Sequence, residues 1–161
     1  PGPRVEYDLV GHPPSFAYAL AFPFCTRTRA VTLIQEYHQA PNLMMWGLPG
    51  GCLDPAKHGG PEQCARAELS EEAHLQGGQW LALLPEGHPG LHETKWCLNT
   101  MHPFLVLDAE ADSSPGARDA EELISIETLP IDEVESLAMR GAMCMPSLAT
   151  TLLSLSKLRA L

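Results

Sequence analysis

A short acidic segment, Glu68-Leu69-Ser70-Glu71-Glu72, most restricts the folds that are open to this chain. On an α-helix, positions 68, 71 and 72 are three and four residues apart, so their carboxylates share one face. The opposite face is small and apolar, with Ala65, Leu69 and Ala73. Pro61 suits the first turn of such a helix, and Gly77-Gly78 follow its end. The segment therefore predicts a helix from about residue 61 to 75, with one stripe for packing on a sheet and one acidic stripe.

The acidic stripe needs a partner, because three like charges on one helical face destabilise the helix unless they are neutralised. Mg²⁺ prefers carboxylate oxygens and keeps sites for water and phosphate oxygens. A solvated helix face is the ordinary alternative for such a run taken alone. Upstream, however, Leu48-Pro49-Gly50-Gly51 reads as a strand end entering a glycine turn, where the backbone can approach a ligand closely. Together the two segments predict a metal–phosphate site.

Strand and helix signals alternate along the rest of the chain. Segments rich in β-forming residues predict strands at 16–22, 30–36, 46–48, 79–84, 95–107 and 121–127. Polar stretches at 86–94 and 108–119 predict loops. Two closing helices are expected, the first with Asp132 as N-cap and Glu135 completing a capping box, the second over about 146–158. This order predicts an α/β (α+β) fold with a mixed β-sheet sandwiched between helices. We expect a Pro/Gly-rich lead-in at residues 1–15 and a single domain at 16–161.

The composition of the chain limits the classes of partner and the compartment that we expect for it. The chain carries 20 Asp and Glu against 10 Lys and Arg, a net charge of −10, which repels nucleic-acid backbones and suits a site that recruits cations. Its five cysteines form no CxxC pair, which argues against a disulfide framework or a structural zinc site and favours a reducing compartment. No apolar run approaches the roughly 20 residues that span a bilayer. We therefore expect no nucleic-acid or membrane partner, and an intracellular protein, cytoplasmic or in an organelle after removal of a targeting segment, rather than a secreted one.

The segment from Gly51 to Leu75 resembles the Nudix box, G-x5-E-x7-R-E-U-x-E-E-x-G-U, where U is aliphatic. Glu68, Glu71 and Glu72 match the metal-binding glutamates of that box. In the family a carbonyl of the preceding Gly-Gly turn often joins the metal, which would place Gly50 in the site.

Three positions depart from the box. Ala67 stands in place of its arginine, His74 in place of its glycine, and Lys57 nearest to the first glutamate, with about two extra residues before the helix. The glutamate–arginine brace of the family is therefore missing, which puts the rigidity of the loop and the rate in question more than metal binding.

Two flanking segments resemble the ADP-ribose and ADP-sugar pyrophosphatase branch of the family. The segment from Ile34 to His38 is similar to its Gln-Tyr-Arg strand end, and Pro89-Gly90-Leu91-His92-Glu93 is similar to its Pro-Gly loop. The resemblance implies a Nudix fold and cleavage of an ADP-sugar such as ADP-ribose into AMP and a sugar phosphate. Mg²⁺, or alternatively Mn²⁺, would be the cofactor, and a homodimer is implied as well.

The residues themselves suggest further roles. Glu72 and Glu93 are both candidates for the base that activates water. His38, Lys57 and Glu93 are candidates for contacts with phosphate or sugar, and Trp46 for stacking on adenine; exposed loop charges and core packing are the alternative interpretations of His38, Lys57 and Trp46. The substrate is expected to be a small nucleotide. Two other functions stay open: hydrolysis of another dinucleotide such as NADH, and a non-catalytic Nudix module that senses nucleotides or scaffolds a partner.

Overall fold

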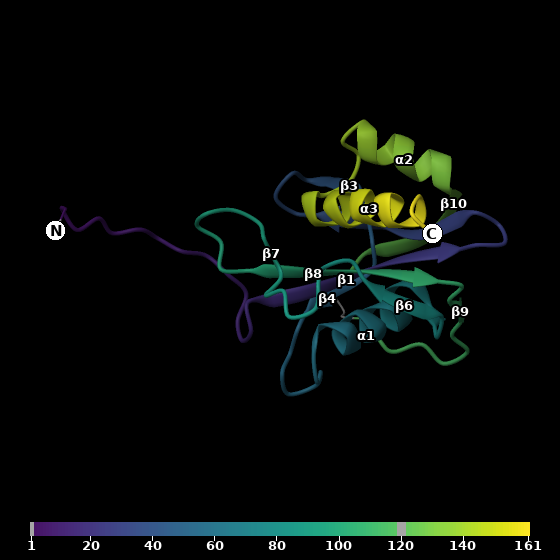
Figure 1. The fold of residues 1–161 in the computed structure, drawn as a ribbon, viewed down its shortest axis with the longest axis horizontal. Helices are drawn as coiled ribbons and strands as arrows, with labels where there is room; N and C mark the ends of the chain where they lie inside the picture. The colour runs from purple at the N-terminus through teal and green to yellow at the C-terminus, as the bar shows by residue number, and fades with distance from the viewer. Residues whose placement is uncertain (1, 119–121) are drawn as a thin grey trace.

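The computed structural model describes residues 2–118 and 122–161 (Figure 1). A β-sheet forms its middle layer, with helix α1 on one face and helices α2 and α3 on the other (Figure 1). The main sheet consists of β1 (Ala17–Cys25), β2 (Ala30–His38), β3 (Leu43–Gly47), β4 (Gly50–Cys52), β6 (Gln79–Ala82), β7 (Leu91–His92), β8 (Thr100–Leu107) and β10 (Ile124–Pro130). The helices are α1 (Pro61–Ala73), α2 (Ile131–Met139) and α3 (Met145–Leu158). The predicted mixed sheet between helices is confirmed.

Strand β1 lies in the centre of the sheet. The order is β10-β2-β1-β8-β6, with β3 added to β2, β4 to β1 and β7 to β8. β1 and β8 run parallel, and the other pairs of the main sheet are antiparallel. A small second sheet joins β5 (Leu75–Gln76) to β9 (Glu110–Ala111). Because β4 and β8 both pair with β1, the glycine turn and the loop before β8 come to the same end of β1.

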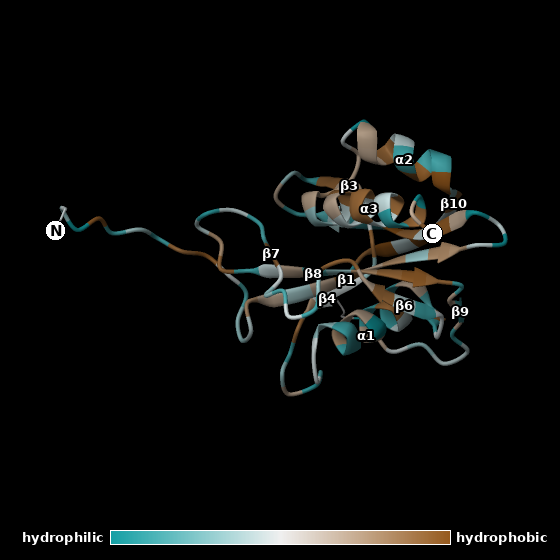
Figure 2. Ribbon diagram, in the orientation of Figure 1, coloured by the Kyte–Doolittle hydropathy of each residue, from teal (hydrophilic) through white to brown (hydrophobic). Residues whose placement is uncertain are grey.

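The two faces of β1 differ in side-chain size, because successive residues of a strand point to opposite faces. Ala19 and Ala21 lie under α1, in clusters with Ala65 and Leu69 of that helix. Leu20 and Phe22 point to the other face, into the larger core that α2 and α3 cover. Brown, apolar segments occur along the strands of the sheet between paler and more polar ones (Figure 2). The small side chains under α1 allow the acidic helix to lie close to the sheet.

The capping box predicted for α2 is wrong. The helix begins at Ile131 with Pro130 as its N-cap, and no side chain caps it. Strand β10 runs directly into the helix, and the Ile131 N–H donates to the Arg29 carbonyl at 2.9 Å, so the turn between β1 and β2 satisfies the helix start. Asp132 therefore lies in the first turn, where its charge suits the positive end of the helix.

Other boundaries move by a few residues. The strand expected from 95 begins at Thr100, because Thr94–Cys97 form a turn in which the Cys97 N–H donates to the Thr94 carbonyl. The strand expected at 46–48 is longer and forms a hairpin with β2, with His38 opposite Leu43. Residues 119 and 121, at the ends of a predicted loop and a predicted strand, lie outside the described residues.

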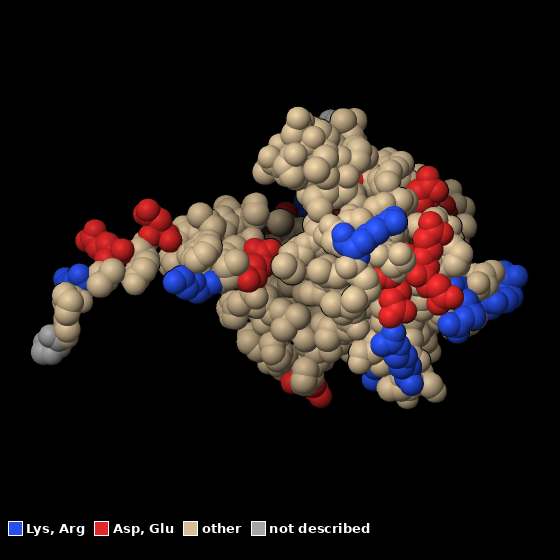
Figure 3. All heavy atoms as spheres, turned by 90° about the horizontal axis from the view of Figure 1, so that it is seen from above, with Lys and Arg blue, Asp and Glu red and all other residues tan. Residues whose placement is uncertain are grey.

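The N-terminal segment runs away from the body of the molecule (Figure 1). Val10 joins it to the loop before β8 through a parallel bridge with Cys97. The division at residue 15 stays a prediction. On the face seen over α2 and α3, acidic side chains lie beside basic ones (Figure 3), and Arg159 pairs with Glu135 at 2.6 Å. In the part of the chain that the structure describes, no helix is both long and apolar enough to cross a membrane.

Candidate functional site

Helix α1 packs on the sheet with the stripe that the sequence predicts. Ala65 and Leu69 are fully buried and Ala73 nearly so. The acidic side chains lie on other sides of the helix, yet Glu72 is only 3% exposed. A solvated helix face therefore does not describe Glu72, which is enclosed by protein.

The Glu72 carboxylate is joined to the glycine turn. The Gly50 N–H donates to Glu72 Oε2 at 2.8 Å. A Cβ atom on Gly50 would lie 2.4 Å from the Ala19 carbonyl oxygen and 2.9 Å from the Leu20 Cα, both of them backbone atoms of β1. Only glycine can bring the turn this close to β1, so the turn and the helix are set against each other by backbone geometry.

Burial raises the pKa of Glu72 to about 9, and acidic neighbours add to the effect. The hydrogen bond from Gly50 acts in the opposite direction and only partly offsets the loss of water. Glu68, Glu122 and Glu36 are the acidic residues that raise this pKa further. The carboxyl group thus lies where negative charge is crowded and poorly solvated.

Glu68 approaches the same turn at the next glycine. A Cβ atom on Gly51 would lie 2.2 Å from Glu68 Oε1, so the missing side chain leaves the room that this carboxylate occupies. Glu68 and Glu72 therefore meet at two consecutive glycines, Gly50 and Gly51.

Glu71 lies elsewhere. A Cβ atom on Gly116 would lie 2.5 Å from Glu71 Cγ and 2.9 Å from its Oε1, so this side chain extends over the loop that follows β9. In residues 2–118 and 122–161, no three acidic, histidine or cysteine side chains form a ready metal cluster. The structure brings Glu68 and Glu72 to the glycine turn and leaves Glu71 beside Gly116.

A family model described as the NUDIX domain matches residues 16–148. The chain belongs to the Nudix family. No curated protein matches the chain.

Many solved structures share the fold, and two of them are as follows. A crystal structure of an ADP compounds hydrolase has a TM-score of 0.73 at 17% identity, covering 89% of this chain and 73% of that one. The NUDIX domain of Shewanella oneidensis NrtR, complexed with ADP ribose, has a TM-score of 0.64 at 18% identity, covering 96% of this chain and 90% of that one. At these identities the likeness shows the Nudix fold.

An arginine from a distant loop contacts the C-terminal end of α1. Arg118 donates to the Glu71 carbonyl at 3.0 Å, the Glu72 carbonyl at 2.8 Å and the Ile124 carbonyl at 3.2 Å. Two of these carbonyls belong to the last turn of α1, which has no basic residue of its own. An arginine there satisfies carbonyls that the helix leaves unpaired. The Nudix helix is therefore held at its C-terminal end by Arg118.

His74 occupies the glycine position of the Nudix box. It is the C-cap of α1 and has a left-handed backbone with φ of 54°. Glycine adopts this conformation without a steric cost, whereas a residue with a Cβ does not. The departure at position 74 thus carries a strained backbone that the family residue would avoid.

Glu93 is held in place by two donors. The Tyr18 hydroxyl donates to Glu93 Oε1 at 2.7 Å, and the Cys97 thiol donates to Glu93 Oε2 at 2.9 Å. Sequence reasoning missed both donors. Tyr18 is 75 residues away in the chain, and Cys97 is four residues away. Burial raises the pKa of Cys52, a residue of β4, and the charges of Glu68 and Glu93 add to the effect.

Two cavities adjoin Tyr18. The larger, about 590 Å³, is lined mainly by apolar side chains, including Leu91, Met101, Met145 and Ala149, with Glu93 beside Tyr18. The smaller, about 150 Å³, contains Glu36, His38, Gly50 and Ser147 in its lining. Within this lining, His38 Nε2 lies 3.9 Å from Glu36 Oε2.

Two of the predicted substrate residues are placed apart. Neither Trp46 nor Lys57 is among the described residues that line these two cavities. Trp46 packs against the main core and pairs with Met143, and Lys57 is exposed in the turn that Asp54 begins. The core-packing interpretation of Trp46 and the exposed-loop interpretation of Lys57 fit these positions better.

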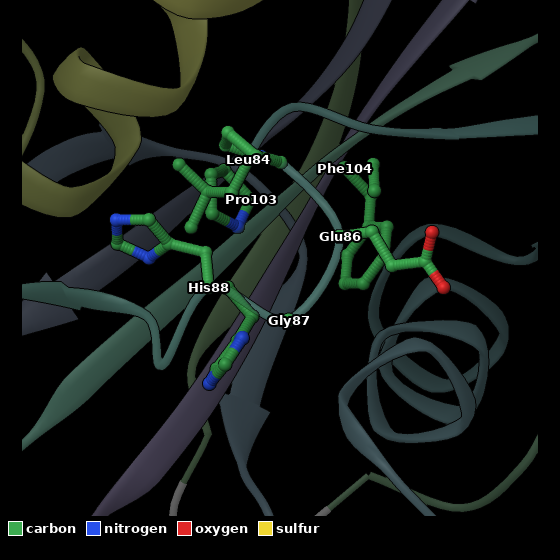
Figure 4. Close-up of a pocket in the computed structure, with 9 residues that line it drawn as sticks. Leu84, Glu86, Gly87, His88, Pro103 and Phe104 are labelled. Atoms are coloured by element: carbon green, nitrogen blue, oxygen red, sulfur yellow. The ribbon is translucent and has the colours of Figure 1, made fainter.

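A further cavity of about 290 Å³ is lined by Ala82, residues 84–88 and residues 102–104 (Figure 4). His88 and His102 line it, but the Glu86 carboxylate points away from the imidazole of His88 (Figure 4). His88 Nδ1 accepts a hydrogen bond from the Gly90 N–H at 3.1 Å, which places the ring proton on Nε2. This arrangement does not suit a metal bridge between the two histidines.

The residues at the glycine turn fit a divalent cation. Nudix hydrolases generally use such ions. Glu72 is buried, three acidic side chains raise its pKa, and Glu68 fills the space left by Gly51. A divalent cation would neutralise this charge, and its preference for hard oxygen ligands matches the donors present.

Proposed function

We propose that this Nudix protein hydrolyses the pyrophosphate bond of a nucleoside diphosphate linked to a second group, in a reaction that depends on Mg²⁺. The substrate class that we infer is an ADP-sugar such as ADP-ribose, with AMP and a sugar phosphate as products. The observation that carries the proposal is the buried Glu72 carboxylate, which accepts a hydrogen bond from Gly50 among acidic neighbours.

Glu68 and Glu72 are the residues that would hold the ion, with the backbone of the Gly50-Gly51 turn beside them. Bound Mg²⁺ would offset the charge of the diphosphate and activate the attacking water. Glu71 joins this set only if its side chain leaves Gly116, so we assign it a secondary role in metal binding. Mn²⁺ offers similar coordination chemistry and is the alternative ion.

We assign the role of base to Glu93 rather than Glu72. Glu72 is enclosed by protein and only 3% exposed, so a water molecule cannot reach it as it reaches an exposed carboxylate. Glu93 is exposed and lines the larger cavity, so a substrate and a water molecule can both approach its carboxylate. A base must lie within hydrogen-bond reach of the proton it takes, and Glu93 has the freer approach.

The cavities support a substrate with one apolar, flat group and one polar group. The larger cavity is within the size range of small-molecule sites, and its lining of Leu, Met and Pro side chains suits a nucleobase. The smaller cavity presents His38, Glu36 and Ser147, which suit hydroxyls of a ribose or another sugar. Of the solved structures with this fold, one is named as an ADP compounds hydrolase and another is complexed with ADP ribose, which supports adenine as the base.

Phosphorus NMR tests this proposal. Purified protein with Mg²⁺ and ADP-ribose should convert the diphosphate signals into two monophosphate signals, and EDTA should abolish the conversion. A panel of ADP-glucose, NADH and ATP ranks the substrates. Failure of the wild-type protein to release AMP from any ADP-sugar, with Mg²⁺ or with Mn²⁺, would reject the proposed activity.

A second candidate is a non-catalytic Nudix module that binds the same nucleotide. The position of Glu71 over Gly116 and the absence of a ready three-ligand cluster in the described residues favour it. Such a module would show ADP-ribose binding by calorimetry without product in the NMR assay. An enzyme would show both.

A further inference from the structure

The Glu93 carboxylate lies on an exposed loop between β7 and β8, yet both of its oxygens are engaged. The Tyr18 hydroxyl and the Cys97 thiol approach from different elements: Tyr18 from the central strand β1, and Cys97 from the turn just before β8. An exposed glutamate normally keeps several rotamers, and fixing one costs conformational entropy. Two donors on one carboxylate therefore mark this orientation as one that the fold specifies.

Tyr18 is itself firmly placed. β1 pairs with β4 on one side and β8 on the other, so Tyr18 lies opposite both Cys52 and Met101. Its ring lines both the apolar cavity and the polar cavity. The hydroxyl thus holds Glu93 in the lining of the larger cavity, next to the residue that lines both of the spaces that we assign to the two halves of the substrate.

Both donors keep their protons at neutral pH. Burial raises the pKa of Tyr18, and the bond to Glu93 adds to that effect. The same carboxylate raises the pKa of the Cys97 thiol. Neither group competes with Glu93 as a base, and each can act only as a donor toward it.

We propose that Tyr18 and Cys97 are positioning residues that hold the Glu93 carboxylate in the lining of the larger cavity, beside Tyr18, which lines both cavities. The proposal rests on the proposed function, because Glu93 is the base only if the chain hydrolyses its substrate. Tyr18 acts through Glu93 and not on phosphorus. Its loss should therefore lower kcat with little change in KM.

A double-mutant cycle tests whether Tyr18 acts through Glu93. Tyr18→Phe removes the hydroxyl and keeps the ring, and we expect kcat to fall roughly ten- to hundredfold. In a Glu93→Gln background the same change should have little further effect, since the residue it positions is already disabled. Cys97→Ser should retain more activity than Cys97→Ala, because serine keeps a donor. Multiplicative losses in the double variant would overturn the proposal.

The matched control is Tyr37→Phe. Tyr37 also donates through its hydroxyl to a nearby oxygen, Asn42 Oδ1 at 2.6 Å, but in the hairpin between β2 and β3. It should leave kcat, KM and the pH profile unchanged. The pH profile of Tyr18→Phe should shift on the limb that reports the base, which a change of packing alone would not do.

Hydrogen exchange of residues 91–98 gives a readout that needs no activity. Tyr18→Phe should speed exchange in this loop roughly tenfold, and Tyr37→Phe should not. If the wild-type protein hydrolyses no ADP-sugar, the proposed function fails, and this exchange alone decides the positioning role. Faster exchange then supports it, and unchanged exchange overturns it.

Discussion

The Gly50 N–H and the Glu72 carboxylate are joined by a hydrogen bond of 2.8 Å that spans 22 residues of sequence. It fixes the end of the glycine turn against the last turn of α1. Because Glu72 is buried and has acidic neighbours, this bond holds a carboxyl group in a place that a free carboxylate would avoid. A divalent cation bound here, as we propose, would offset the crowded negative charge.

Gly51→Ala should abolish metal binding without unfolding the protein. The three heavy atoms nearest to the new Cβ all belong to the end of the flexible Glu68 side chain, which would have to rotate away. We expect the free energy of unfolding to fall by about 1 kcal/mol or less, and the rise in Tm on adding Mg²⁺ to be lost.

Two other glycines serve as comparisons for Gly51→Ala. Gly60→Ala meets nothing within 4 Å and should keep the Mg²⁺ effect. Gly50→Ala meets the backbone of β1 and should cost about 2–3 kcal/mol of stability. A Gly51→Ala protein that melts like the wild type with and without Mg²⁺ would contradict the role given to Glu68.

The metal-free protein should lose stability as the pH rises from about 5 to about 9. The pKa of Glu72 is about 9 in the folded protein against an ordinary 4.5, so the folded state holds its proton more tightly. That contribution is complete below pH 4.5 and is lost by the time the pH passes 9. Urea unfolding in EDTA across this range measures it.

Glu72→Gln should flatten this pH profile, because the amide stays neutral and can still accept from Gly50. Glu62→Gln is the matched control, since Glu62 is exposed and pairs with Arg66 at 2.8 Å. Parallel profiles for the wild type and Glu72→Gln would show that the buried carboxyl group does not titrate as described.

Arg118→Ala should cost about 2 kcal/mol, because three carbonyls lose a charged donor and two of them end α1. Urea unfolding gives the free energy, and Arg118→Lys should recover part of it with a single point charge. Arg27→Ala, at an exposed position in the turn after β1, is the comparison and should change stability little. Equal losses of stability in Arg118→Ala and Arg27→Ala would contradict the stabilising role that we give to Arg118 at the end of α1.

His74→Gly should raise stability by about 0.5–1 kcal/mol, because it relieves the left-handed backbone at the end of α1. In a chain of this size such a gain raises Tm by roughly 1–4 °C in a thermal scan. The same change at His92, in strand β7 and without a positive φ, should lower stability instead. A loss of stability at position 74 would mean that the His74 side chain contributes more than its backbone costs.

Much of the fold could be predicted because its signals are local. The spacing of Ala65, Leu69 and Ala73 identified the packed face of α1, and the two glycines identified the turn that faces it. The predicted N-cap of α2 was wrong. The Ile131 N–H, at the start of the helix, donates to the Arg29 carbonyl, whereas the sequence pattern predicted that Asp132 would cap the helix. Local patterns cannot show a partner that the fold brings from 102 residues away: Ile131 and Arg29 meet only because β2 and β10 pair.

The candidate site was only partly predictable for the same reason. The bond between Tyr18 and Glu93 spans 75 residues, and Arg118 reaches Glu72 across 46. Nothing near Tyr18 or Arg118 in the sequence indicates either contact. Glu71 was expected beside Glu68 and Glu72 because helical spacing aligns them, but the loop that contains Gly116 gives its side chain another place to lie.

Titration with Mn²⁺, followed by the electron paramagnetic resonance signal of the free ion, tests the metal site most directly. The wild-type protein should bind Mn²⁺ saturably, which lowers the signal of the free ion, and ADP-ribose should tighten this binding. The double variant Glu68→Gln, Glu72→Gln should not bind the ion. Binding that is unchanged in the double variant, or no binding by the wild-type protein even with ADP-ribose present, would contradict the claim that these two carboxylates and the Gly50-Gly51 turn form the ion site.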